Sequence, residues 1–132
     1  MLALVLRRYQ CQDAACGAVL IVGPRVVRWR HLYSGAAIAF ALAAWALERS
    51  SAREVRAAVS VFAIVGAAAR GWASLARWAR SSHELWSSVR PWPDDWPPRR
   101  IAERAARTVA SAAPVATGVV ALDVFVGAEH AR

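Results

Sequence analysis

Sixteen consecutive residues, Leu32 to Leu47 (LYSGAAIAFALAAWAL), carry no charge, and they are followed directly by Glu48 and Arg49. As an α-helix this run would be about 24 Å long, somewhat shorter than the hydrocarbon core of a bilayer, about 30 Å. Alanine avoids water but is too small to fill a core, so the run is suited to close packing between helix backbones. It must be buried on nearly every side, either in lipid or in a helical bundle.

A second apolar run, Ala57 to Ala69, follows a clear helix start. Ser51 and Glu54 match the S-x-x-E capping box, which predicts that a helix begins near Ser51 after a tight turn. We therefore expect an antiparallel helical hairpin over Leu32–Arg70. Small residues at helical spacing would let its two helices approach closely. These residues are Gly35, Ala39 and Ala43 on the first helix and Ser60, Ala63 and Ala67 on the second.

The next segment, Arg70 to Arg90, is amphipathic. Leu75, Trp78, Leu85 and Val89 share one stripe of a helix, with Trp86 beside it, and the opposite face carries Arg70, Arg77, Arg80 and Glu84. Arginine opposite tryptophan and leucine is typical of a helix lying in a membrane interface. The alternative is an ordinary amphipathic helix packed on a core.

The stretch RPWPDDWPPRR, Arg90 to Arg100, ends that helix, because its four prolines oppose both helix and central strand. Indole rings suit the headgroup layer of a membrane. We expect this stretch to be a connector that lies at the depth of the lipid headgroups. We assign a membrane-interface role to eight residues between Arg70 and Trp96. They are Trp72, Trp78, Trp86, Trp92, Trp96, Arg70, Arg77 and Arg80.

The C-terminal part combines a charged helical stretch with an apolar one. Glu103 can pair with Arg100 or Arg107 at helical spacing. Thr108 to Gly127 then forms a twenty-residue, mostly apolar run that contains Pro114, Gly118 and one charge, Asp123. An acid within an apolar run can be an ion or proton site, but a position near a helix end, close to water, is the favoured interpretation.

Little in the sequence points to chemistry. The two cysteines, Cys11 and Cys16, lack a second ligand pair, so we expect ordinary thiols and neither a metal site nor a cofactor. The run Ala14–Gly23 could be a strand, a half-buried helix or a re-entrant piece, and Gly23-Pro24 permits a hairpin turn. No motif of a hydrolase, kinase or nucleotide-binding enzyme is present, so we expect no enzymatic activity.

Composition favours a membrane environment. Hydrophobic residues make up 58% of the 132 residues. The net charge of +8 is the difference between 17 arginines and 9 acidic residues, and lysine is absent. We predict a small all-α membrane protein with four parts: a basic N-terminal segment with a short apolar stretch (1–31), a helical hairpin that is the candidate transmembrane unit (32–70), an amphipathic helix with its connector (71–107), and an apolar C-terminal helix with a tail (108–132).

The predicted function is that of an adaptor, assembly factor or holin-like protein acting through helix association. Its expected partners are a bilayer with anionic headgroups and a protein partner or a second copy. The arginine-rich flanks would face the cytoplasm, and the acid-poor N-terminus also resembles an organelle transit peptide. The alternatives are a soluble basic helical module that binds an acidic protein or, less expected, a nucleic acid, an ion conductor using Asp123, or a reading frame with no selected fold.

Overall fold

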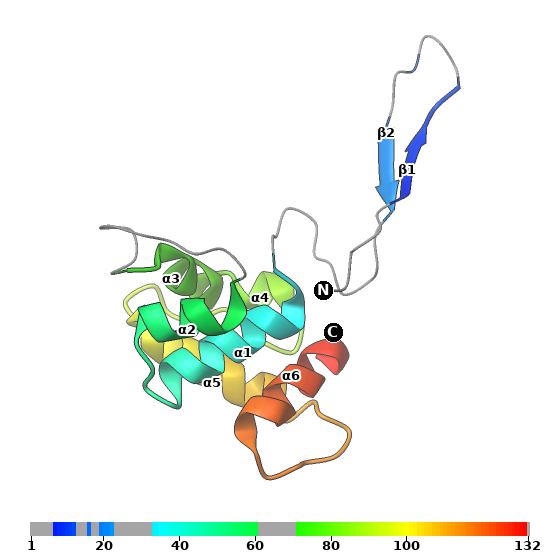
Figure 1. The fold of residues 1–132 in the computed structure, drawn as a ribbon. Coiled ribbons are helices and arrows are strands. Elements are labelled where there is room, and N and C mark those ends of the chain that lie inside the picture. The colour runs from blue at the N-terminus through cyan, green and yellow to red at the C-terminus, as the bar shows by residue number, and fades with distance from the viewer. Residues whose placement is uncertain (1–6, 13–15, 17–18, 23–32, 61–70, 132) are drawn as a thin grey trace.

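The structure is a computed structural model that describes residues 7–12, 16, 19–22, 33–60 and 71–131. Its elements are two strands and six helices in chain order. They are β1 (Arg7–Gln10), β2 (Val19–Val22), α1 (Gly35–Ala46), α2 (Ala52–Val59), α3 (Ala73–Arg80), α4 (Ser82–Leu85), α5 (Pro98–Ala110) and α6 (Val120–His130). The helices pack into one body, and the strands form a hairpin that stands away from it (Figure 1).

The hairpin pairs β1 with β2 in antiparallel register, with Arg7 opposite Val22 and Gln10 opposite Val19. Of the three alternatives considered for the run Ala14–Gly23, namely a strand, a half-buried helix and a re-entrant piece, the described residues Val19–Val22 adopt the strand. The turn, however, lies between Gln10 and Val19, so it precedes the Gly23-Pro24 pair that we considered as a hairpin turn. Cys11 and Cys16 lie in this turn and are exposed.

Helix α1 is the centre of the helical body. Ser34 caps its N-terminus, since the hydroxyl accepts a hydrogen bond from the N–H of Ala37 at 3.1 Å. Most of its residues are buried, and it packs against α5 and α6 more extensively than against α2 and α3. The uncharged run is thus covered mainly by α5 and α6, and to a smaller extent by α2 and α3.

The turn from α1 to α2 is as tight as predicted. Arg49 takes a left-handed backbone conformation with φ 60°, which reverses the chain. The capping box is confirmed: the Ser51 N–H donates to Glu54 at 2.8 Å, and the Glu54 N–H donates to the Ser51 hydroxyl at 3.3 Å. The helical hairpin is therefore present at α1 and α2. Most of the second apolar run, residues 61–69, lies outside the described residues.

Helices α3 and α4 divide the predicted amphipathic helix at Ser81. The apolar stripe is confirmed, because Leu75, Trp78, Leu85 and Val89 are all buried. The chain then runs without helix through the proline-rich connector until Pro98, which occupies the first position of α5, where a missing N–H costs nothing.

The C-terminal apolar run is not one helix. Helix α5 ends at Ala110, a loop holds Pro114 and Gly118, and α6 begins only at Val120. Proline cannot donate the helical hydrogen bond, and Gly118 adopts a positive φ of 80° that suits glycine. For these reasons the apolar C-terminal helix expected within 108–132 is limited to α6, which is shorter than the apolar run 108–127.

The all-α prediction is confirmed for the helical body, which the described residues build from six helices. Its membrane-spanning part is not supported. Among the helices that the structure describes, none combines the length and the apolar character needed to cross a bilayer.

Candidate functional site

Four of the five tryptophans predicted for the membrane interface lie in two aromatic groups. In the first group Tyr33, Trp72 and Trp78 pack edge to face, with ring centroids 4.9 to 5.7 Å apart. The guanidinium of Arg56 lies over the Trp72 ring at 5.6 Å. Such aromatic pairs add about 0.5–1.5 kcal/mol each beyond the area they bury, so this cluster attaches α3 to the start of α1.

Two of the expected interface residues lie in the core. The Trp86 side chain is 1% exposed and Trp78 is also buried, because the apolar stripe of α3 and α4 faces the other helices. These two indoles are occupied by helix packing, in agreement with the alternative interpretation of the amphipathic segment.

The second group is the connector itself. Trp92 and Trp96 are half-buried and stacked, with centroids 5.7 Å apart and planes 9° apart. The Arg100 guanidinium lies 3.8 Å from the centroid of the Trp96 ring, a favourable cation–π distance. Arg100 thus stacks on an indole, while Asp94 and Asp95 are exposed.

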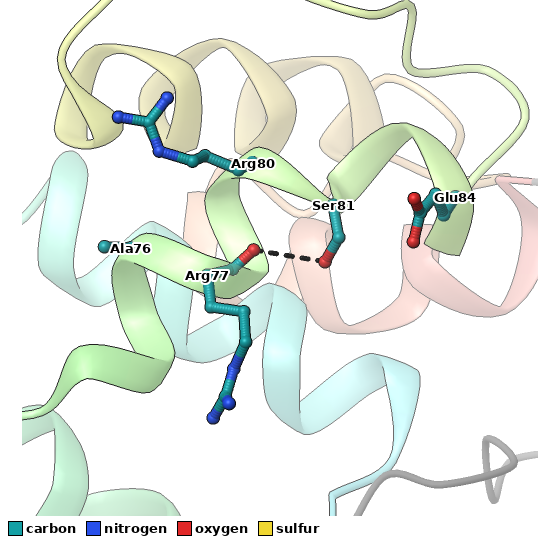
Figure 2. Close-up of a pocket in the computed structure, with 5 residues that line it drawn as sticks. All are labelled: Ala76, Arg77, Arg80, Ser81 and Glu84. Carbon is teal, nitrogen blue, oxygen red and sulfur yellow. Dashed lines mark hydrogen bonds between the residues drawn. The ribbon is translucent and has the colours of Figure 1, made fainter.

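Arg77 and Arg80 line a shallow depression on α3 and α4, together with Ser81 and Glu84 (Figure 2). The Ser81 hydroxyl donates to the Arg77 carbonyl oxygen at 3.1 Å, and Arg77 Nη2 donates to the Ser74 hydroxyl at 3.2 Å. Figure 2 shows the two arginine side chains pointing away from each other. The depression therefore does not hold a single anion between both guanidinium groups.

A more enclosed cleft of about 290 Å³ lies between α4 and the connector, and its lining also includes Arg80 of α3 and Ile101 of α5. Its polar lining is Arg80, His83 and Asp94, and Pro91, Trp92 and Pro93 form an apolar wall. Nδ1 of His83 is 3.1 Å from the Arg80 carbonyl oxygen. Since that oxygen only accepts, Nδ1 is the donor, and Nε2 is the ring nitrogen left for another partner.

A second surface, on α6, was not expected from the sequence. Six large apolar side chains on α6 and the preceding loop are 41 to 74% exposed. We call this set the apolar ridge; it consists of Val115, Val119, Val120, Leu122, Phe125 and Val126. The buried side of α6 consists of Asp123, Val124, Gly127 and Ala128. Apart from Val124, the larger apolar residues of α6 thus face outward, unlike those of an ordinary amphipathic helix.

Two local restraints hold α6 in this orientation. Asp123, in its first turn, accepts hydrogen bonds from the Thr117 N–H and the Thr117 hydroxyl, both at 2.7 Å. Gly127 lies directly against the backbone carbonyl of Val109 on α5, where a Cβ would overlap the oxygen and lie 2.9 Å from the carbon. Rotating α6 to bury the apolar ridge would break both contacts.

Asp123 thus links the first turn of α6 to the preceding loop through its hydrogen bonds with Thr117. The Thr117 N–H, and then the Thr117 hydroxyl, lower the pKa of the Asp123 carboxyl, and burial opposes them only in part. A carboxyl with a lowered pKa stays charged at neutral pH, which fits the end-of-helix interpretation. It does not favour a proton-transfer site.

Other predicted positions have structural roles or lie outside the described residues. Gly35, Ala39 and Ala43 are buried in α1, and Ser60 is the C-cap residue of α2. Ala63, Ala67 and Arg70 lie outside the described residues. Within the described part of the chain, no three His, Cys, Asp or Glu residues are grouped closely enough to hold a metal ion.

The chain matches no protein-family model, no curated protein and no solved structure.

Proposed function

We propose that the protein is a non-enzymatic, membrane-associated helical module that docks on an anionic bilayer surface through the apolar ridge. The observation that carries this proposal is the outward display of Leu122, Phe125 and Val126 on a helix whose orientation is held by its inner contacts. Contiguous exposed apolar surface marks an interaction site in a folded protein. A helix face of this kind can sit at the boundary between headgroups and acyl chains without crossing the bilayer.

Charge favours anionic lipid as the occupant. Helix α5 packs against α6, and its exposed side carries Arg100, Arg104 and Arg107. Arg107 also forms an ion pair with Glu103, with Nη2 3.1 Å from Oε1. Basic residues near an anionic membrane contribute about 1 kcal/mol each, whereas the net charge of +8 opposes association of two copies.

Vesicle flotation tests this function. The full chain is mixed with vesicles of phosphatidylcholine alone, or of phosphatidylcholine with phosphatidylserine, and the bound fraction is measured at low and high salt. We expect binding to the mixed vesicles that weakens with salt, since surface electrostatics are screened.

The decisive variant is the double substitution Leu122→Gln with Phe125→Gln. Inserting either side chain into an apolar environment is worth about 1.5–3 kcal/mol, so the double variant should lose at least about tenfold in partitioning. Glu129→Gln is the matched control, because Glu129 is exposed on the same helix and losing its negative charge should preserve or improve binding. Failure of the wild-type chain to float, or equal flotation of the double variant, would favour the alternative of a basic module for an acidic protein or nucleic acid.

A further inference from the structure

The cleft between α4 and the connector brings opposite charges together without pairing them. Arg80 and Asp94 are both among the residues that line this space of about 290 Å³. Within the described residues neither takes part in an ion pair, since the one ion pair found there joins Arg107 to Glu103. The cleft therefore presents a cation and an anion, each open to a ligand.

The wall of the cleft that Pro91, Trp92 and Pro93 form is mostly apolar and rigid. Pro91 and Pro93 offer no backbone N–H and hold φ near a fixed value. The Trp92 ring is braced by its stack on Trp96. The charged or ionisable side chains of the lining are Arg80, His83 and Asp94, and Trp92 adds a buried Nε1 without a hydrogen-bond partner within the described residues. Little ordering of the wall is needed when a ligand enters.

These charges select against simple ions. A plain anion attracted by Arg80 would meet the Asp94 carboxylate, and a plain cation attracted by Asp94 would meet Arg80. A ligand with one charge of each sign satisfies both. His83 is held by its bond to the Arg80 carbonyl, so its free Nε2 offers a further polar contact beside Arg80.

We propose that this cleft binds a small zwitterion of the α-amino-acid class. The carboxylate of the ligand would pair with Arg80, its ammonium group with Asp94, and its apolar side chain would lie against Trp92 and the two prolines. The volume suits a molecule of this size and excludes a large cofactor. The site is separate from the apolar ridge, so this proposal does not depend on the proposed function.

The test is isothermal titration calorimetry of the full chain with L-leucine, N-acetyl-L-leucine and L-leucinamide. We expect saturable binding of L-leucine, and binding weaker by about tenfold or more for each modified compound, since each lacks one charge-assisted contact. Absence of saturable binding by L-leucine, or equal binding of all three compounds, would overturn the proposal.

The chain supplies matched controls for both charged residues. Arg80→Gln and Asp94→Asn should each weaken L-leucine binding about tenfold. Arg77→Gln and Asp95→Asn should leave it unchanged, because Arg77 and Asp95 are exposed neighbours that do not line the cleft. Circular dichroism of all four variants verifies folding, and equal losses in the cleft variants and their controls would contradict the assigned contacts.

Discussion

Arg99 donates two hydrogen bonds to the carbonyl oxygen of Trp45, from Nε at 2.9 Å and from Nη2 at 2.7 Å. The same Nη2 donates to the Ser50 carbonyl at 3.2 Å, and the guanidinium lies 5.5 Å from the Trp45 ring centroid. A cation at the C-terminal end of α1 meets the negative end of the helix dipole. One side chain at the start of α5 thus joins α1, the α1–α2 turn and the connector.

Replacing Arg99 with lysine should destabilise the fold even though the charge is kept. A lysine ammonium cannot reproduce the fork that donates to one carbonyl while lying over the indole. We expect Arg99→Lys to lower the free energy of unfolding by about 1–2 kcal/mol and Arg99→Ala by about 2–3 kcal/mol. Denaturant unfolding followed by circular dichroism gives these values. Arg104→Lys is the control and should change stability by less than about 0.5 kcal/mol, because Arg104 is an exposed residue of the same helix. A neutral Arg99→Lys would show that the fork is not needed.

Trp86 should behave as a core residue. Its side chain is buried, and its Nε1 has no hydrogen-bond partner within the described part of the chain. Trp86→Ala should cost about 3–5 kcal/mol in unfolding free energy, as expected for a large buried aromatic. Trp86→Phe should cost far less, because it keeps a ring and removes a buried unpaired N–H. Equal losses in the two variants, measured by denaturant titration, would mean that the indole N–H is bonded in solution.

Local features of the fold were predictable from the sequence. The capping box at Ser51 and Glu54 lies within four residues, and the prolines after Arg90 act through their own backbone. The apolar stripe of α3 and α4 follows from helical periodicity alone. Each of these features depends on interactions between residues that are close together in the sequence.

The candidate surfaces depend on contacts that periodicity does not reveal. Arg99 and Trp45 are 54 residues apart in the chain, and no sequence signal links them. Whether Leu122 and Phe125 face inward or outward depends on Gly127 meeting the Val109 backbone. The outward ridge therefore emerges only from tertiary packing, although Pro114 and Gly118 already marked a break in the apolar run. Tryptophan was misleading for a related reason, since a ring suited to a membrane interface is equally suited to a core.

Stability should fall in acid partly through Asp123. Its pKa is lowered in the folded state by the Thr117 N–H and hydroxyl, so the unfolded chain takes up a proton first as the pH drops. The contribution of this carboxylate is complete above the unfolded pKa, about 3.9, and is lost as the pH falls through the lower folded pKa. Unfolding free energies measured between neutral pH and about pH 3 should show a smaller acid loss for Asp123→Asn than for the wild type. Glu54→Gln should act in the same direction, since the Ser51 backbone N–H and hydroxyl lower the pKa of the Glu54 carboxyl. An unchanged pH profile in both variants would contradict these assignments.

Gly127 gives the sharpest test of how α6 is held. In an open helix interior, exchanging glycine for alanine is stabilising by about 0.5–1 kcal/mol. At this position the new Cβ would overlap the Val109 carbonyl oxygen, lie 2.9 Å from the carbonyl carbon and 3.3 Å from the Ala113 nitrogen. These are backbone atoms of the preceding helix and loop, which cannot rotate away as a side chain could. We therefore expect the sign to reverse, with Gly127→Ala lowering the free energy of unfolding by about 1–3 kcal/mol.

The matched control is Gly71→Ala, where a Cβ would meet nothing within 4 Å and the change should stay within about 0.5 kcal/mol. Hydrogen exchange on the same variants locates the effect. Gly127→Ala should increase exchange in α6 before it affects α1, because the clash separates α6 from α5 while the capped start of α1 is untouched. If Gly127→Ala proved stabilising, α6 could not lie against Val109, and the outward direction of Leu122 and Phe125 would lose its physical cause.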